Sequence, residues 1–227
     1  KDEPASELLK RLRQNRKKVL TASDLQEAKT MLQKLDGLLP AVAKYSIPRT
    51  WEFVRVIDLA MLMVDCHNKT APYVARGIPI IRTSNIRNRA FRMNDLKFVD
   101  RDTYDFWSRR CPPAPEDIIF TREAPMGEAA IIPDGEIYCL GQRTMLIRPM
   151  HGFVNNRYLL FALTEPGLLS RAVPAAVGAT VKHLRVGDVE GLEIALPPLA
   201  EQHRIVAKVD ELMALCDKLE AQENDSE

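Results

Sequence analysis

Arginine, asparagine and small hydroxyl side chains alternate along residues 81–89, which read Ile-Arg-Thr-Ser-Asn-Ile-Arg-Asn-Arg. Arginine matches the acceptor pair of guanine, asparagine matches the donor and acceptor of adenine, and serine or threonine binds phosphate or base. A solvated polar loop after a strand, or a charged strand edge, would have the same composition. Beside these structural alternatives, the residue types predict nucleic-acid contacts from Arg82, Thr83, Ser84, Asn85, Arg87, Arg89, Arg122, Arg143 and Lys182.

Common sequence motifs of catalysis are missing. The chain has no G-x-x-x-x-G-K-[ST] phosphate loop, no G-x-G-x-x-G dinucleotide loop, no G-x-S-x-G nucleophile elbow and no [DNS]-P-P-[YFW] tetrad. Pro133-Asp134-Gly135-Glu136 comes nearest to a metal nuclease, but Tyr138 stands where a catalytic lysine is needed. An Asp-Gly turn between strands explains that segment through backbone chemistry alone. We therefore expect no enzymatic activity, no metal and no cofactor.

The charges are unevenly distributed, although the formal net charge is only +1. The stretch from Arg76 to Arg92 holds five arginines and no acidic residue, whereas the residues after Asp217 are mostly acidic. A local excess of one sign, rather than the net charge, indicates the partner. The arginine stretch therefore favours an anion-binding face.

The cysteine pattern and the apolar runs predict a cytoplasmic protein. The four cysteines are scattered without a C-x-x-C pair, which favours reduced thiols over disulfides or a zinc site. No apolar run approaches the roughly 20 residues needed to cross a bilayer. The first residues are charged and unlike a signal peptide, and Lys1 in place of methionine indicates a piece of a longer chain.

The middle of the chain predicts an α+β domain with a mixed sheet. Short apolar runs bounded by proline, glycine, asparagine or aspartate predict strands at residues 78–82, 117–121, 129–132, 145–147 and 192–196. Two helices are expected between them, around residues 102–109 and 156–171. No regular strand–helix–strand alternation occurs, so antiparallel or mixed pairing is expected.

Helices are predicted at both ends of the chain. Leu8, Leu9, Leu12 and Val19 give residues 1–44 a partial apolar face, and Ser23 with Gln26 forms a capping-box pattern. Pro197 and Pro198 predict the start of the last helix. Each end carries a heptad seam, which indicates that the terminal helices meet each other or a second copy as an antiparallel coiled coil. The seam residues include Leu25, Leu32, Leu35 and Leu39, and Ile205, Val209, Leu212 and Leu219.

Several segments, in order, resemble specificity subunits of type I restriction-modification systems. They are KDEPASELLKRLRQNRKKV (1–19), IPRTWEFVRVIDL (47–59), GIPIIRTSNIRN (77–88), PEDIIFTREAPMGEAAII (115–132) and VGATVKHLRVGDVEGLEIALPPLAEQHRIV (177–206). The resemblance covers nearly the whole chain, and Trp51 is its expected packing anchor. The chain departs from the family pattern at Glu116, where a glycine is usual, and at Ala124 or Pro125, which replaces the first loop glycine.

The resemblance implies the C-terminal half of such a subunit, with a conserved helical region (1–44), a target-recognition domain (45–198) and a conserved coiled-coil helix (199–227). By this resemblance the domain reads one half of a split site in double-stranded DNA. The helices act as a spacer and dock the modification (methyltransferase) subunits and, through them, the restriction subunit. Methyl transfer and ATP-driven cleavage would belong to those partners. An alternative is a docking module that binds DNA only weakly, and the fragment could also pair with itself.

Overall fold

A four-stranded antiparallel sheet forms the centre of the protein. The computed structural model describes residues 2–38, 40–172 and 183–224. The strand order is β2 (Ala60–Asp65), β10 (Thr144–Pro149), β7 (Ile118–Arg122) and β8 (Met126–Ile131). Every residue of β7 is buried, so the sheet is covered on both faces.

Smaller sheets and a helix extend this centre. In the three-stranded sheet β6 (Lys97–Val99), β3 (Ile78–Ile81), β9 (Cys139–Leu140), the β3–β9 pair is parallel. β4 (Ile86–Arg87) and β5 (Ala90–Phe91) form a short hairpin. α4 (Arg101–Ser108) begins after Asp100, which accepts a hydrogen bond from the backbone N–H of Thr103. The predicted α+β class with mixed strand pairing is therefore confirmed.

The helix predicted over residues 156–171 is divided in two. α5 runs over Asn156–Leu163 and α6 over Leu168–Ala172. Asn155 caps α5 by accepting hydrogen bonds from the backbone N–H groups of Arg157 and Tyr158. Pro166 lies in the break, where a proline ring cannot continue the helical hydrogen bonds.

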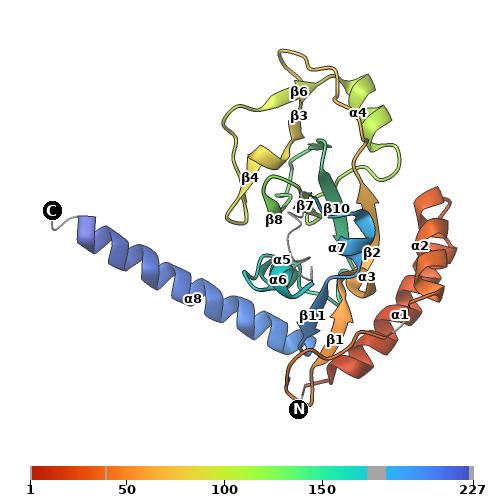
Figure 1. Cartoon of the computed structure of the whole chain (residues 1–227), viewed down its shortest axis with the longest axis vertical. Helices are drawn as coiled ribbons and strands as arrows, with labels where there is room; N and C mark the ends of the chain where they lie inside the picture. Colours follow the sequence, from red (N-terminus) through yellow and green to blue (C-terminus); the bar gives the residue numbers. More distant parts are fainter. Residues whose placement is uncertain (1, 39, 173–182, 225–227) are drawn as a thin grey trace, which may run out of the picture.

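The two ends of the domain meet in one strand pair. β1 (Glu52–Arg55) lies antiparallel to β11 (Glu193–Leu196), with Glu52 opposite Leu196. α3 (Val56–Leu59) follows β1, and α7 (Val186–Glu190) precedes β11. As a result, α1 (Ala5–Thr21) and α8 (Leu199–Asn224) both leave the domain from the end where β1 and β11 lie (Figure 1).

α1 packs against the domain through an apolar face and one buried cation. Leu8, Leu12 and Leu20 are buried, whereas Val19, predicted to be apolar contact surface, is 43% exposed. Arg16 is also buried, and its Nη1 donates to the carbonyl oxygens of Ile57, Asp58 and Ala60 at 2.8, 3.0 and 3.0 Å. Arg16 thereby satisfies carbonyl groups around the end of α3.

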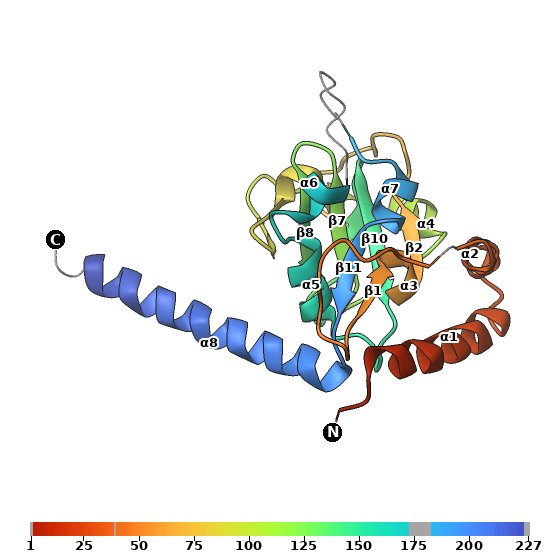
Figure 2. The same cartoon turned by 60° about the horizontal axis from the view of Figure 1, so that its bottom comes forward.

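The first heptad seam packs against the core of the same chain. α2 (Gln26–Asp36) buries Ala28 and Met31, and Leu32 and Leu35 pack on the same core. The predicted capping box is not formed, because Ser23 Oγ accepts from the backbone N–H of Leu25 instead. Leu39 lies outside the described residues. Figures 1 and 2 show α2 and α8 on opposite sides of the domain, so the two seams do not pair with each other in this chain.

α8 begins at Leu199, directly after Pro198, as the sequence predicts. Ile205 packs against the core and Val206 is buried, but further along the helix Leu212 and Leu219 are 49% and 53% exposed. The helix spans 26 residues, about 39 Å, and extends away from the domain (Figure 2). Its outer apolar side chains contact little of the described chain.

Two departures from the family pattern coincide with left-handed backbone. Glu116 has φ 69° and Ala124 has φ 35°, conformations in which glycine avoids the clash of a Cβ atom. A glycine at either position, as the resemblance leads one to expect, would adopt this backbone without the Cβ clash.

We expect Glu116→Gly to relieve strain, and Asp134→Gly to serve as its control, since Asp134 is exposed and acidic with an ordinary negative φ. Both changes add similar unfolded-state entropy, and the 3.2 Å pair between Glu116 and His151 is exposed and contributes little, so their difference is mainly the left-handed cost of about 1–2 kcal/mol. Denaturant unfolding should find Glu116→Gly the more stable variant by that amount. Equal free energies of unfolding would contradict the argument.

Candidate functional site

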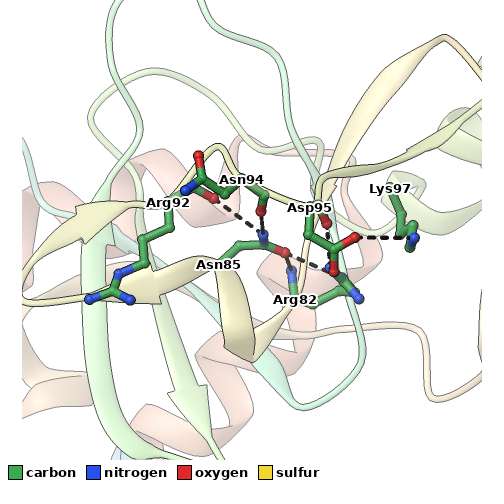
Figure 3. A network of polar contacts seen from close by, with 6 residues as sticks. All are labelled: Arg82, Asn85, Arg92, Asn94, Asp95 and Lys97. Carbon is green, nitrogen blue, oxygen red and sulfur yellow. Dashed lines mark hydrogen bonds and ion pairs between the residues drawn. The ribbon is translucent and has the colours of Figure 1, made fainter.

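Asn85 closes the arginine-rich segment into a loop. Its side chain is 1% exposed, and its Oδ1 accepts from the backbone N–H and Nε of Arg82 at 3.2 and 3.3 Å. Its Nδ2 donates to the carbonyl oxygens of Arg92 and Asn94 at 3.2 and 3.4 Å (Figure 3). We call residues 82–95 the clamped loop, because this buried amide joins its two ends.

Arg82 completes the clamp. Its Nη2 donates to the carbonyl oxygen of Asp95 at 2.6 Å and to Asp95 Oδ2 at 3.1 Å, and Lys97 contacts the same carboxylate at 3.3 Å. Hydrogen bonds from Arg82 and Lys97 lower the pKa of Asp95, which keeps the carboxylate charged. Arg82 and Asn85 thus use their polar groups within the loop, and their predicted DNA contacts remain predictions.

The tip of the clamped loop presents its remaining polar residues. Asn88 and Arg89 have φ 52° and 64°, the paired left-handed conformation of a tight two-residue hairpin turn between β4 and β5. The backbone N–H of Asn88 donates to Glu128 Oε2 on β8 at 2.9 Å, which ties the tip to the central sheet. The exposed Arg89 lies over the Phe161 ring of α5, 5.6 Å from its centroid.

Other polar groups flank the tip. Arg87 is half-buried and donates to the carbonyl oxygens of Thr83 and Ile86. Ser84 is exposed in the short helix η1 (Thr83–Asn85), where Thr83 is half-buried. Figure 3 shows the guanidinium of Arg92, a residue of the arginine stretch, pointing away from the clamp. The loop therefore separates buried framework residues from exposed cations.

Arg122 and Arg143 lie next to each other at one end of the central sheet. The backbone N–H of Arg122 donates to the carbonyl oxygen of Arg143 at 2.8 Å. Arg122 is 8% exposed, and its guanidinium pairs with Asp65 and donates to the carbonyl oxygen of Leu184 at 3.2 Å. Arg143 is exposed, with a 2.9 Å ion pair to Glu123. Of the two, Arg143 has the side chain that solvent and a ligand can reach.

One close backbone contact joins this region to the clamped loop. The N–H of Gly141 donates to the carbonyl oxygen of Ile81 at 2.8 Å, and a Cβ at Gly141 would lie 2.6 Å from that oxygen. Only glycine fits such an approach. Gly141 thus brings the segment before Arg143 against the start of the clamped loop. Lys182 lies outside the described residues.

The partners of these arginines were not found from the sequence. Asp65, Asp95 and Glu128 hold Arg122, Arg82 and the hairpin tip, respectively. A second missed pair is buried Asp117 with Arg148, whose Nε and Nη2 donate to its two oxygens at 2.8 and 2.7 Å. The sequence offered a local signal for one contact only, because Asp95 and Lys97 are two residues apart and could be expected to form an ion pair.

The described residues hold neither a metal-ligand cluster nor a bilayer-crossing helix. Those residues contain no group of three or more histidine, cysteine or acidic side chains placed to hold a metal ion. Cys66, Cys111 and Cys139 are buried free thiols, and Cys216 is an exposed one. Among the described helices, none combines the length and hydropathy of a bilayer-crossing segment.

A family model described as the type I restriction modification DNA specificity domain matches residues 48–226. The chain belongs to this family. It is 25% identical to the EcoAI specificity subunit and 26% identical to the EcoEI specificity subunit, both of Escherichia coli type I restriction enzymes. These alignments cover 96% and 97% of the chain but only 37% of each relative.

Solved structures confirm the fold. The chain matches the HsdS subunit of Thermoanaerobacter tengcongensis with a TM-score of 0.54 and 19% identity, over 95% of this chain and 50% of that one. A chain from a study of complex assembly and conformational transition in the type I R-M system gives a TM-score of 0.56 and 19% identity, over 97% and 52%. The shared fold thus covers at least 95% of this chain, which spans about half of each of those two chains.

We expect Asn85→Ala to open the clamped loop. It leaves the backbone N–H of Arg82 and the carbonyl groups of Arg92 and Asn94 without their partner, which should cost about 2 kcal/mol of the free energy of unfolding. Asn94→Ala is the matched control, because Asn94 contributes only its backbone carbonyl to the clamp. Denaturant unfolding with hydrogen exchange at Arg82 should separate the variants, and equal stability would contradict a clamping role for Asn85.

Proposed function

We propose that the chain recognises double-stranded DNA sequence-specifically through the clamped loop and the neighbouring end of the central sheet. The observation that carries the proposal is the buried Asn85 clamp, which holds an exposed arginine-bearing turn rigidly on the sheet of a DNA specificity domain. Rigid presentation supports base readout, because side chains must meet base edges within hydrogen-bond distance. The named relatives, which are specificity subunits, support the same function.

Within this proposal the residues divide into two roles. Arg87, Arg89 and Arg143, with Thr83 and Ser84, supply contacts to bases or phosphates. Arg82 and Asn85 hold the loop, and Arg122 with Asp65 holds the end of β7. This division follows burial and existing hydrogen bonds, because a polar group already bonded within the protein must break those bonds before it reaches DNA. Arg87, half-buried and bonded to the carbonyl oxygens of Thr83 and Ile86, has to break those bonds to make its contact, whereas Arg89 does not.

We also propose that the chain is one half of a longer specificity subunit, reading one half of a bipartite site. α8, about 39 Å long, is close to the 34–36 Å of one turn of B-DNA. Its seam, half-buried at Val209 and exposed at Leu212 and Leu219, fits a partner helix in the other half, or in a second copy. Modification subunits, and through them the restriction subunit, would dock on the helices and carry out the chemistry in the cytoplasm.

A docking module with only weak DNA binding of its own is the second candidate function. The observation in its favour is the exposed apolar surface on the outer half of α8, where Met213 and Leu215 are 48% and 53% exposed beside the seam. Exposed apolar area of this kind marks an interaction surface. The two functions predict different effects of substitution: changes in the clamped loop should weaken DNA binding, and changes on α8 should weaken assembly. The two experiments below therefore separate them.

Arg89→Ala tests DNA readout in the assembled complex. If Arg89 contacts a base, the change should cost about 1–3 kcal/mol of binding free energy and relax specificity at one position. If Arg89 contacts a phosphate, its loss should weaken binding to all DNA sequences about equally, and the binding affinity should depend less steeply on salt concentration. Fluorescence anisotropy at several salt concentrations measures both. Arg49→Ala, at an exposed arginine outside the site, is the control, and equal effects would count against the proposal.

Charged substitutions on α8 test docking. Leu212→Glu with Leu219→Glu should abolish association with partner subunits, because two charges would be buried in the seam. DNA binding by the domain itself should persist. Ala214→Glu, on the opposite side of the helix, is the control and should assemble normally. Size-exclusion chromatography measures assembly, and normal assembly of the double variant would exclude the seam as the docking surface.

A further inference from the structure

A cavity of about 310 Å³ lies between α1, α2 and the residues that follow α2. Figure 1 shows these helices on the side of the domain away from the β4 hairpin, so the cavity is separate from the proposed DNA surface. Its walls differ in character. Three cations of α1, Arg13, Arg16 and Lys17, line one side, and Leu32 and Leu35 of α2 line the other. The volume is at the lower end for small-ligand sites.

Arg16 is the buried cation of this cavity. It is 3% exposed, and all its hydrogen bonds to the described residues come from Nη1. Its Nε and Nη2 have no acceptor among those residues, and Arg16 is part of the cavity lining. Burial lowers the pKa of Arg16 to about 10, as expected for a cation whose desolvation is incompletely compensated. Two adjacent guanidinium donors match the two oxygens of a carboxylate.

The charge around Arg16 also favours an anion. Arg13 and Lys17 are exposed and one helical turn apart, so both side chains stand at the mouth of the cavity. Asp36 and Asp58 also line it. Asp58 Oδ2 accepts from the backbone N–H of Arg55 at 3.1 Å, and its Oδ1 lies 4.0 Å from Arg13 Nη2. Three cations against two carboxylates leave one positive charge in excess. A single carboxylate on an aliphatic body complements both this charge and the leucine wall.

We propose that this cavity binds an aliphatic carboxylate. The carboxylate oxygens lie on the Nε and Nη2 edge of Arg16, between Arg13 and Lys17, and the hydrocarbon packs on Leu32 and Leu35. A free short-chain fatty acid and a glutamate side chain of a partner polypeptide carry the same chemistry. The proposal does not depend on DNA recognition.

Hexanoate is the probe, titrated into the labelled 227-residue chain and followed by NMR. Saturable shifts are expected at Arg13, Lys17 and the methyl groups of Leu32 and Leu35. Hexanamide has the same shape without the charge and should give no saturable shift. Absent saturation with hexanoate, or equal binding of hexanamide, would overturn the proposal.

Lys17→Gln tests the charge while leaving the buried Arg16 in place. Because Lys17 is exposed, its loss should weaken hexanoate binding about two- to five-fold. Lys18→Gln is the matched control, since Lys18 is an exposed neighbour on the same helix outside the cavity, and it should bind normally. Equal effects of the two variants would refute the site. Acetyl-Leu-Glu-Leu-amide identifies the source: tighter binding than hexanoate assigns a polypeptide side chain, and weaker binding assigns a free acid.

Discussion

The pairing of β1 with β11 is the constraint on which the arrangement of this protein depends. These strands are the first and last of the domain, and their antiparallel register places Glu52 opposite Leu196. The chain therefore enters β1 and leaves β11 at the same end of the pair, and a 2.9 Å hydrogen bond from the backbone N–H of Ala5 to the carbonyl oxygen of Thr50 places the start of α1 there too. The loops that carry Arg87, Arg89 and Arg143 belong to other strands, so their orientation relative to α1 and α8 is fixed by the sheets between them.

A second constraint is the burial of polar groups near the candidate site. A buried amide or guanidinium is stable only when its donors and acceptors are bonded. Asn85 meets this condition with bonds to three other residues of the clamped loop, and Arg122 with Asp65 and Leu184. Such groups specify one loop conformation. The exposed arginines can then differ between relatives without altering the framework that holds them.

Local signals in the sequence predicted the longer helices and five of the eleven described strands, β3, β7, β8, β10 and β11, whereas the contacts of the site depend on nonlocal pairing. The helix start at Leu199 follows from Pro198, and the strands around residues 80, 120 and 146 follow from bounded apolar runs. Of the six strands that were not predicted, β2 has a continuous apolar run with no period of its own, and β4, β5 and β9 are only two residues long. The role of Arg122 could not be predicted, since Asp65 lies 57 residues away. The role of Asn85 depends on the backbone carbonyl groups of Arg92 and Asn94, and every residue carries such a group, so the sequence does not reveal which ones Asn85 binds.

The direction of α8 is set at its first turns rather than along its length. Gln202 is fully buried, donating to the carbonyl oxygen of Pro197 and accepting from the backbone N–H of Asn155. The indole N–H of Trp51 donates to Glu201 at 3.0 Å, and Arg157 pairs with Asp210. These bonds tie the helix to the residue before β1 and to α5, so Trp51 anchors α8 through a polar contact, and its expected role in apolar packing stays a prediction. Beyond Asp210 the exposed leucines lack that support, and an isolated helical segment is only marginally stable in water. A partner helix on that seam would stabilise the outer half, while the anchored first turns determine how far from the domain the partner lies.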